Sequence, residues 1–451
     1  MPLDNTEAAM AAVEHADATS NGDQDPTSSG PTATVAELIE PLVHSLLGEI
    51  TVELVFWDGS SIGAPNPAGR IFVRSQNALQ RIVWAPDELG LGRAYVAGEI
   101  DFKGDIFALI KALRPAGRAI HKGLRALPAV LTAAQKLDLF HLPPEAPQTE
   151  ARVKGWRHSK RRDASDISHH YDVGNDFYRL ILGPSLTYSC ARFAEPGMTL
   201  AEAQASKHEL TCRKLGLHEK PDQRLLDVGC GWGSMAMHAA LEHQANVVGV
   251  TISQEQAELA QQRVAEAGLS ERVEIRLQDY RDLRGETFDA ISSIGMFEHV
   301  GKVHMAKYFR ILNDLLRPTG RLLNHAISSV GGSKLGNRSF IYRYVFPDGE
   351  LIDVGNVVQA MESSGFEVRD VESLREHYAE TLRHWVANLE LHRGEVTRLV
   401  GEERTRVWHL YMAASAVGFE DGGLGVHQVL GVKPSSEGES GMARTRHDFA
   451  S

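Results

Sequence analysis

The chain has 451 residues, 43% of them hydrophobic and 24% charged, which is the composition of a globular protein long enough for two or three domains. Its formal net charge of −12 excludes the global basic field of a typical nucleic-acid-binding protein, so no nucleic-acid partner is expected. The sequence has no apolar run long enough to span a bilayer and no signal peptide, so any membrane contact is expected to be peripheral. Three cysteines, Cys190, Cys212 and Cys230, show neither metal-type spacing nor a disulfide framework, which predicts no metal site and a reducing, cytoplasmic location.

The first third of the sequence predicts a polar tail followed by a small α+β domain. Residues 1–33 are rich in Ala, Thr, Ser, Asp and Gly, so they bury too little apolar surface to offset ordering and are expected to be disordered. Residues 34–141 carry the patterns of short helices and strands. The predicted elements are a helix over 35–47 that Thr34 caps, a strand over 52–56, a turn at Asp58-Gly59, a strand over 71–74, and a helix over 106–113 that ends before Pro115.

Two basic clusters lie near the end of this domain. The first mixes basic with apolar side chains, which suits either an anionic membrane surface or an ordinary solvated helix face. The second lies in the polar stretch 142–167, which we interpret as a linker. The first cluster holds Lys111, Arg114, Arg118, Lys122, Arg125 and Lys136, and the second holds Lys154, Arg157, Lys160, Arg161 and Arg162.

From residue 168 to residue 435, strand and helix patterns alternate. This rhythm predicts an α/β domain with a parallel, doubly wound sheet, and residues 436–451 are expected to form a flexible tail. The predicted strands are 224–228, 246–251, 273–277, 288–294, 321–327, 366–373 and 424–432, and the predicted helices are 234–242, 254–267, 302–316, 378–400 and 402–417.

A glycine-rich turn follows the first of these strands, in the sequence LLDVGCGWG over 225–233. Glycines at alternate positions let the backbone turn tightly and approach a ligand, and Asp227 adds a carboxylate that would meet a cation or hydroxyls. The turn lacks the spacing of a dinucleotide fingerprint, the second strand ends in Thr251 and Ser253 rather than an acid, and no phosphate-binding Lys follows, which disfavours a nicotinamide dehydrogenase. S-adenosylmethionine (SAM), a nucleoside without a diphosphate, fits better.

Several further stretches match one known family in order. They are HYDVGNDFY over 170–178, TYSC over 187–190, LDVGCGWG over 226–233, TISQEQA over 251–257, MFEHVG over 296–301, HAI over 325–327, YVFPDG over 344–349 and HYAETL over 377–382. With these motifs the chain resembles the cyclopropane-fatty-acid synthase family, which includes the mycolic acid cyclopropane synthases, from His169 to about Val432. The stretch 91–105, with Tyr95, Gly98 and Asp101, is similar to the small N-terminal domain of the longer, phospholipid-acting members.

The resemblance implies a Rossmann-like class I SAM-dependent methyltransferase domain with a site for each reactant. The implied SAM-binding residues are Tyr188, Ser189, Gly229, Gly231, Thr251, Gln256, Asp279 and Tyr280. The implied catalytic residues form a bicarbonate pocket from Cys190, Glu298, His325, Ile327 through its backbone, and Tyr378. Cys190 is interpreted as pocket wall, because nothing in the sequence indicates a His-activated thiolate. The aromatic faces that would stabilise a cation are those of Phe177, Tyr308, Tyr342, Tyr344 and Phe346.

The implied reaction transfers a methylene unit from SAM to a cis double bond of a membrane phospholipid acyl chain, through a carbocation that bicarbonate deprotonates. The enzyme is expected to be a homodimer, peripheral to the inner face of the membrane, with residues 34–141 helping to capture lipid. Two alternatives stay open: a methyl- or methylene-branched product from the same cation, and a non-catalytic lipid-binding module on the same fold. The chain departs from the family at Ser415, where many members carry a cysteine, and in the residues Asn324-His325-Ala326 around the pocket histidine.

Overall fold

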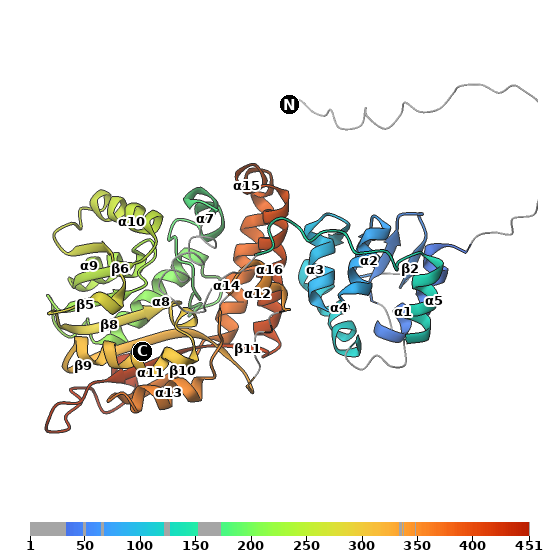
Figure 1. Ribbon diagram of the computed structural model, residues 1–451. Helices are drawn as coiled ribbons and strands as arrows, with labels where there is room; N and C mark the ends of the chain where they lie inside the picture. The colour runs from blue at the N-terminus through green and yellow to red at the C-terminus, as the bar shows by residue number, and fades with distance from the viewer. Residues whose placement is uncertain are drawn as a thin grey trace, which may run out of the picture.

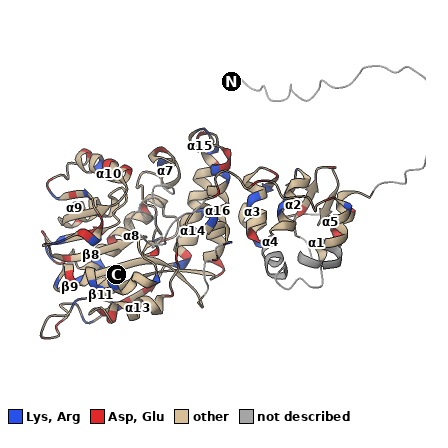
Figure 2. Ribbon diagram, in the orientation of Figure 1, with Lys and Arg blue, Asp and Glu red and all other residues tan. Residues whose placement is uncertain are grey.

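The computed structural model describes residues 33–47, 51–64, 67–120, 127–151, 173–332, 336, 338–347 and 349–450. These residues form two parts, each built on its own sheet, and Figure 1 shows the smaller N-terminal part beside the long helix α16 of the larger part. Lys and Arg residues are interspersed with Asp and Glu along the helices of both parts (Figure 2). None of the helices in the described part of the chain is long and apolar enough to cross a bilayer.

The N-terminal part packs helices against a four-stranded sheet of order β2-β1-β3-β4. Its elements are α1 (Val35–Leu47), β1 (Glu53–Phe56), β2 (Ser61–Gly63), β3 (Gly69–Val73), α2 (Gln76–Trp84), α3 (Glu88–Val96), β4 (Ile100–Gly104), α4 (Ile106–Ile120) and α5 (Leu127–Lys136). One prediction is wrong here, because α4 continues through Pro115 to Ile120. A proline removes one hydrogen bond from a helix interior. Burial of Ile106 and Leu109 in the core fixes the first turn of this helix and helps to offset that loss.

The larger part is an α/β unit around a seven-stranded sheet of order β10-β11-β9-β8-β5-β6-β7. The strands are β5 (Arg224–Val228), β6 (Asn246–Thr251), β7 (Val273–Leu277), β8 (Phe288–Ile294), β9 (Leu316–Ser329), β10 (Glu367–Ser373) and β11 (Leu424–Val432). The five strands β5 to β9 pair in parallel, whereas β11 runs antiparallel to both of its neighbours. The α/β fold class is thereby confirmed, and β9 is longer than predicted.

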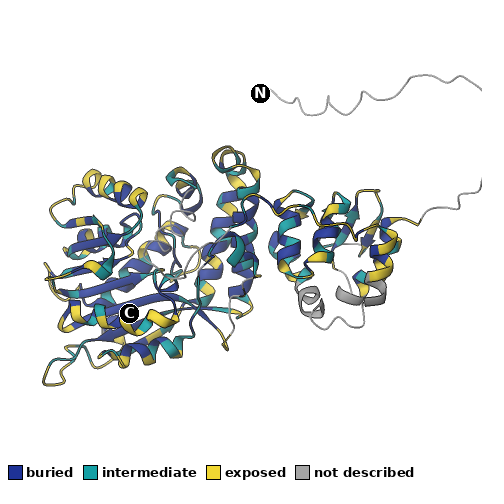
Figure 3. Ribbon diagram, viewed as in Figure 1, coloured by how far each residue is buried: buried dark blue, intermediate teal, exposed yellow. Residues whose placement is uncertain are grey.

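Helices cover both faces of this sheet, and their strand-facing sides are buried (Figure 3). Strands buried on both faces are expected where a parallel sheet is sandwiched between helices. The helices are α7 (Asn175–Leu182), α8 (Leu200–Leu215), α9 (Ser234–His243), α10 (Gln254–Glu266), α11 (Met305–Leu315), α12 (Phe340–Tyr344), α13 (Val354–Glu362), α14 (Arg375–Leu391), α15 (Arg393–Val400), α16 (Glu402–Glu420) and α17 (His447–Ala450), with short 3-10 turns at Tyr280–Asp282, Phe297–His299 and Lys302–His304.

The stretch 91–105 supplies part of the contact between the two parts. The hydroxyl of Tyr95 donates to His409 Nδ1 at 3.0 Å, because His409 Nε2 donates in turn to Glu390 at 2.9 Å. Arg406 of the same helix, α16, donates to the backbone carbonyls of Tyr95 and Ile100 and pairs with Asp101. These buried polar contacts tie the N-terminal part to the helix that, further along, walls a cavity of the larger part.

The C-terminal segment differs from the flexible tail that the sequence predicts. Phe449 of α17 is buried in the core beside α8, and Arg446 pairs with Asp370 and Glu372 of β10. One aromatic anchor and a charged clamp therefore hold a segment whose composition is mostly polar. Several predictions fall outside the described residues: the tail 1–32, Lys122 and Arg125, the second basic cluster, most of the linker, and residues 170–172 of the first family motif.

Candidate active site

Two adjoining cavities lie at the carboxyl ends of the parallel strands, where ligands bind in sheets of this kind. The larger encloses about 410 Å³ and the smaller about 100 Å³. The two cavities share a wall, which is formed by Tyr188, Ser189, Gly295 and His299. The larger volume suits a small-molecule ligand.

The glycine-rich turn between β5 and α9 forms the floor of the larger cavity. Gly229, Gly231 and Gly233 all have positive φ, at 74°, 54° and 80°, a region that costs other residues energy. A Cβ on Gly229 would also lie 2.9 Å from Cγ of Met296, which lines the same cavity. The turn therefore needs glycine both for its backbone conformation and for the space beside Met296.

Gly229→Ala is expected to weaken binding of SAM or its demethylated product by about tenfold or more, since the strain of about 1–2 kcal/mol adds to the contact with Met296. Isothermal titration calorimetry measures this directly. Gly268→Ala is the matched control, because Gly268 has φ +69° and open space around it at the end of α10. Equal affinity losses in the two variants would contradict a local role of Gly229.

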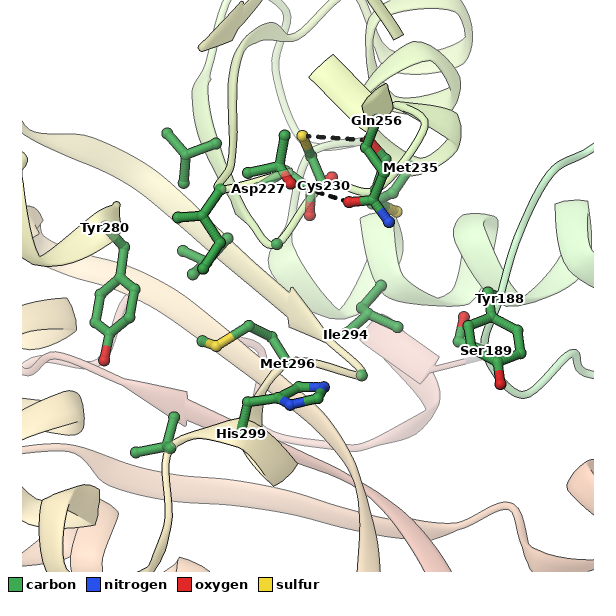
Figure 4. A pocket seen from close by; sticks show the side chains of 18 of the residues that line it. Tyr188, Ser189, Asp227, Cys230, Met235, Gln256, Tyr280, Ile294, Met296 and His299 are labelled. Atoms are coloured by element: carbon green, nitrogen blue, oxygen red, sulfur yellow. Dashed lines mark hydrogen bonds between the residues drawn. The ribbon is translucent and has the colours of Figure 1, made fainter. Parts of the chain in front are cut away.

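All eight predicted SAM-binding residues line the larger cavity, although their roles stay predictions. Figure 4 shows Tyr188 and Ser189 on one side of the space, Tyr280 on another, and Asp227, Cys230 and Gln256 along a third. The hydroxyl of Thr251 donates to Gln256 Oε1 at 2.9 Å, which orients the amide of Gln256. The carboxylate of Asp279 is held by Arg281 and caps a 3-10 turn.

Two buried charged side chains, Lys207 and Asp227, line the larger cavity, and the sequence did not predict the part of Lys207. Lys207 of α8 is wholly buried and its ammonium donates to Ser189 Oγ at 2.9 Å. Asp227 accepts from Ser292 at 2.7 Å through Oδ1, while no described residue hydrogen-bonds its other oxygen, Oδ2. Burial lowers the pKa of Lys207 to about 7 and raises that of Asp227 to about 6. Oδ2 of Asp227 is therefore an acceptor that could attract the ammonium or sulfonium group of SAM.

All five predicted catalytic residues line the smaller cavity, whose other walls are mostly apolar. Glu298 Oε1 accepts from the backbone N–H of Ile327 at 2.7 Å, and Oε2 is buried without a hydrogen-bond partner among the described residues. Burial raises the pKa of Glu298 to about 7. The free oxygen of Glu298 is therefore available for a ligand and titrates near neutrality.

The tautomer of His325 is set by a chain of buried hydrogen bonds. Lys214 donates to Gln428 Oε1 at 2.9 Å, so the amide nitrogen of Gln428 faces His325 Nδ1 at 3.3 Å. Because Nδ1 then accepts, the proton lies on Nε2, a buried atom with no partner in the part of the chain that the structure describes. Burial, helped by Lys207, holds the pKa of His325 well below its usual value. His325 is thus a neutral donor.

Cys190 and Tyr378 complete the smaller cavity in different ways. The Cys190 thiol donates to the backbone carbonyl of Ala191 at 3.1 Å, and burial raises its pKa, which opposes a nucleophilic thiolate. The ring of Tyr378 lies 4.7 Å from that of Phe419, centroid to centroid. Of the predicted aromatic faces, Phe346 lines the smaller cavity and Tyr308 the larger, whereas Phe177 packs on Trp408 and Tyr344 bonds Glu150.

Comparisons with known proteins identify the family. Residues 158–429 match the model of the family described as mycolic acid cyclopropane synthetase. A probable fatty acid methyltransferase of Mycobacterium tuberculosis is 39% identical over 433 residues, covering 91% of this chain and 97% of the relative. The cyclopropane-fatty-acyl-phospholipid synthase of Escherichia coli is 34% identical over 387 residues, which cover 84% of this chain and 92% of the relative.

Among solved structures, one similar protein is mycolic acid cyclopropane synthase CmaA1 complexed with SAH and CTAB. It is 36% identical to this chain with a TM-score of 0.56, and the match covers 60% of this chain and 98% of the CmaA1 chain. The sequence match spans both cavities and the strands that carry them. The glycine turn, the cavity beneath the strand ends and these matches lead to one conclusion: the chain belongs to the mycolic acid cyclopropane synthetase family and is a SAM-dependent methyltransferase.

Proposed function

We propose that this enzyme adds a methylene unit from SAM across a cis double bond of a phospholipid acyl chain and closes a cyclopropane ring. One observation carries the proposal: the smaller cavity is apolar, opens beside the cofactor cavity, and holds two buried polar atoms, Glu298 Oε2 and His325 Nε2, without partners among the described residues. Buried polar atoms normally have hydrogen-bond partners, so these two indicate a small polar ligand.

Bicarbonate fits this donor set. The Nε2–H of His325 would donate to an anionic oxygen, and Glu298 Oε2 would accept from the hydroxyl. The walls of the cavity include Leu351, Leu382 and Val426, whose apolar side chains exclude water and suit contact with the part of an acyl chain around its double bond. Bound there, bicarbonate supplies a base for the proton that leaves the transferred methyl group.

The residues of this chain organise the remaining chemistry. The double bond attacks the sulfonium methyl, so a C–C bond forms as the S–CH3 bond breaks, and the acyl chain carries the positive charge. Rings of Phe346, Tyr378 and Tyr411 line the cavity and stabilise a cation through their faces. Loss of one methyl proton then closes the ring. Glu298 and His325 hold the base beside this carbon rather than react themselves.

A methyl- or methylene-branched product is the second candidate, and the fatty acid methyltransferase from M. tuberculosis favours it by its name. Both products start from the same cation and differ in where the proton leaves. Purified enzyme is incubated with vesicles of cis-unsaturated phospholipid and methyl-labelled SAM, with and without bicarbonate, and the acyl esters are analysed by mass spectrometry before and after mild hydrogenation.

The outcomes separate the candidates. A labelled ester heavier by one CH2 that resists mild hydrogenation, and whose yield falls without bicarbonate, supports ring closure. A labelled ester that takes up hydrogen indicates a methylene branch, and a labelled ester that is already saturated and not cyclic indicates a methyl branch. Absence of label from the acyl esters, with SAM binding intact, would contradict a phospholipid substrate and favour the non-catalytic lipid-binding module.

The lipid surface is proposed to meet the N-terminal part. Phe140 and Leu142, which follow α5, are 52% and 85% exposed, and Trp84 and Leu131 are about half exposed. The backbone carbonyl of His141 accepts from the indole of Trp84 at 2.9 Å, which keeps this apolar segment beside α2. Exposed aromatic and aliphatic side chains of this kind insert into the boundary of a lipid surface.

The double variant Phe140→Ser/Leu142→Ser is expected to bind phospholipid vesicles at least about 100-fold more weakly, because each lost apolar side chain forfeits about 1.5–3 kcal/mol of burial. Vesicle co-sedimentation measures the binding. Leu391→Ser/Leu399→Ser, at exposed positions on α14 and α15 of the larger part, is the matched control. Unchanged vesicle binding of the first double variant would contradict the proposed surface.

A further inference from the structure

Two helices behind the cofactor cavity bring together four metal-ligating side chains. Glu209 and Cys212 lie three residues apart on α8, and therefore on one face. His238 and His243 lie on the last two turns of α9. The thiol sulfur of Cys212 and one ring nitrogen from each histidine lie within 4.8 Å of one another.

The carboxylate of Glu209 contacts the two histidines of this group. Its Oε2 is 3.4 Å from His238 Nε2 and 2.8 Å from His243 Nε2. Its other oxygen, Oε1, faces Arg213 at 3.9 Å, outside the cluster. Zn–N bonds of about 2.0–2.1 Å and a Zn–S bond of about 2.3 Å give ligand separations of about 3.3–3.7 Å in a tetrahedron. The observed separations need only small side-chain movements to reach that geometry.

We propose that Cys212, His238 and His243, with Glu209 as the fourth ligand once its side chain turns toward Cys212, form a structural site for Zn2+ or a similar divalent transition metal. A thiolate, two neutral imidazoles and a carboxylate are ligands that zinc accepts together. Their two negative charges balance the metal charge, which suits a site that is partly buried. The 39% exposure of the Glu209 side chain provides a path for entry.

Hydrogen bonds alone do not account for the whole cluster. Glu209 can bridge the two histidines without a metal, and that bridge leaves Cys212 without a function beside both imidazoles. In the metal-free protein Cys212 is a free, buried thiol. Binding would form a Zn–S bond as the S–H bond breaks, and the proton would leave to solvent.

The position of the site gives it a consequence for the cofactor cavity. Lys207 and His208 of α8 and Ser234 and Met235 of α9 line that cavity, and the four ligands lie further along the same two helices. A metal would therefore clamp together the two helices that form one wall of the cofactor site. We expect it to raise thermal stability without taking part in methyl transfer.

The test uses the full chain, stripped of metal by a chelator and titrated with Co2+. The expected result is one equivalent bound, with the visible bands of tetrahedral cobalt and a near-ultraviolet thiolate-to-metal band that Zn2+ abolishes. Apparent affinity should rise by about tenfold per pH unit, since one thiol proton is released. Zn2+ should also raise the Tm by several degrees.

Two variants and a control locate the site. Cys212→Ser should lose the thiolate band, and His243→Gln should weaken Co2+ binding by at least about tenfold. His392→Gln, at the junction of α14 and α15, should bind as the unaltered chain does. Absence of a thiolate band in the unaltered protein overturns the proposal, whether or not the variants fold. Retention of that band in Cys212→Ser overturns it as well.

Discussion

Glu298→Gln is expected to lower kcat by about 10²- to 10⁴-fold while SAM binds with nearly unchanged affinity. The reason is that a correctly positioned base, which Glu298 is proposed to hold, contributes about that factor to the rate of a proton transfer. The glutamine can still accept from the Ile327 backbone N–H through its carbonyl oxygen, so the local fold is kept. At the position of Oε2, however, an amide donor replaces the acceptor that would orient bicarbonate. Initial rates with labelled SAM, together with calorimetry of cofactor binding, separate the two effects.

Glu274→Gln is the matched control, because Glu274 is exposed on β7 and its substitution removes the same charge from the protein. It should retain activity. Glu298→Asp should recover part of the rate if the position of the acceptor matters, and added bicarbonate should not restore Glu298→Gln fully. A Glu298→Gln enzyme with ordinary kcat would remove Glu298 from the proposed mechanism.

The same variant predicts a change in how stability depends on pH. Burial raises the pKa of Glu298 from an ordinary value of 4.5 to about 7, so the folded protein holds this proton more tightly than the unfolded chain. The stabilisation is fully present below pH 4.5 and is lost as the pH rises through about 7. Urea unfolding over this interval should show stability falling more steeply in the unaltered protein than in Glu298→Gln. Parallel curves would indicate that Glu298 titrates normally.

The strand boundaries and the glycine turn were predictable because their signals are local. β5 to β8 begin and end at the predicted residues, since each is a short apolar run bounded by polar or glycine residues. The helix across Pro115 was not predictable, because a proline signal is local and the packing that overrides it is not. The same holds for Phe449, which is one apolar residue in a polar tail until the fold supplies its neighbours.

The site shows the same division between local and long-range information. Family motifs mark Glu298 and His325. The hydrogen-bond chain from Lys214 through Gln428 to His325, however, joins α8 to β11 and β9 and has no local signature in the sequence. In the sequence, Lys207 is one of several charged residues in a stretch for which no element was predicted, and its burial is visible only after α8 packs on the sheet. Likewise, the spacing of Cys212 from the other cysteines gave no metal signal, because the candidate partner ligands are histidines of α9.

Lys207→Met is expected to weaken SAM binding at neutral pH by about tenfold or more, because the positive charge of Lys207 lowers the pKa of the buried Asp227 carboxylate, and each pKa unit corresponds to about a factor of ten. Without the ammonium, Ser189 loses its donor, and the buried carboxylate of Asp227 loses the charge that holds its pKa down. The pKa of Asp227 should therefore rise above its present value of about 6. More of the carboxylate would then be protonated at neutral pH and unable to attract the cationic cofactor.

This reasoning gives a signature that general destabilisation does not. Cofactor affinity of Lys207→Met should recover as the pH rises through the raised pKa of Asp227, whereas in the unaltered protein Asp227 already ionises as the pH passes about 6. Lys214→Met is the contrast, since Lys214 lies two turns along the same helix, is equally buried, and pairs with Asp370 and Glu372 instead. It should lower stability and leave cofactor affinity intact. A pH-independent loss of affinity in Lys207→Met would indicate that this lysine acts only through the packing of α8. The charge of Lys207 beside Asp227 would then have no part in holding SAM.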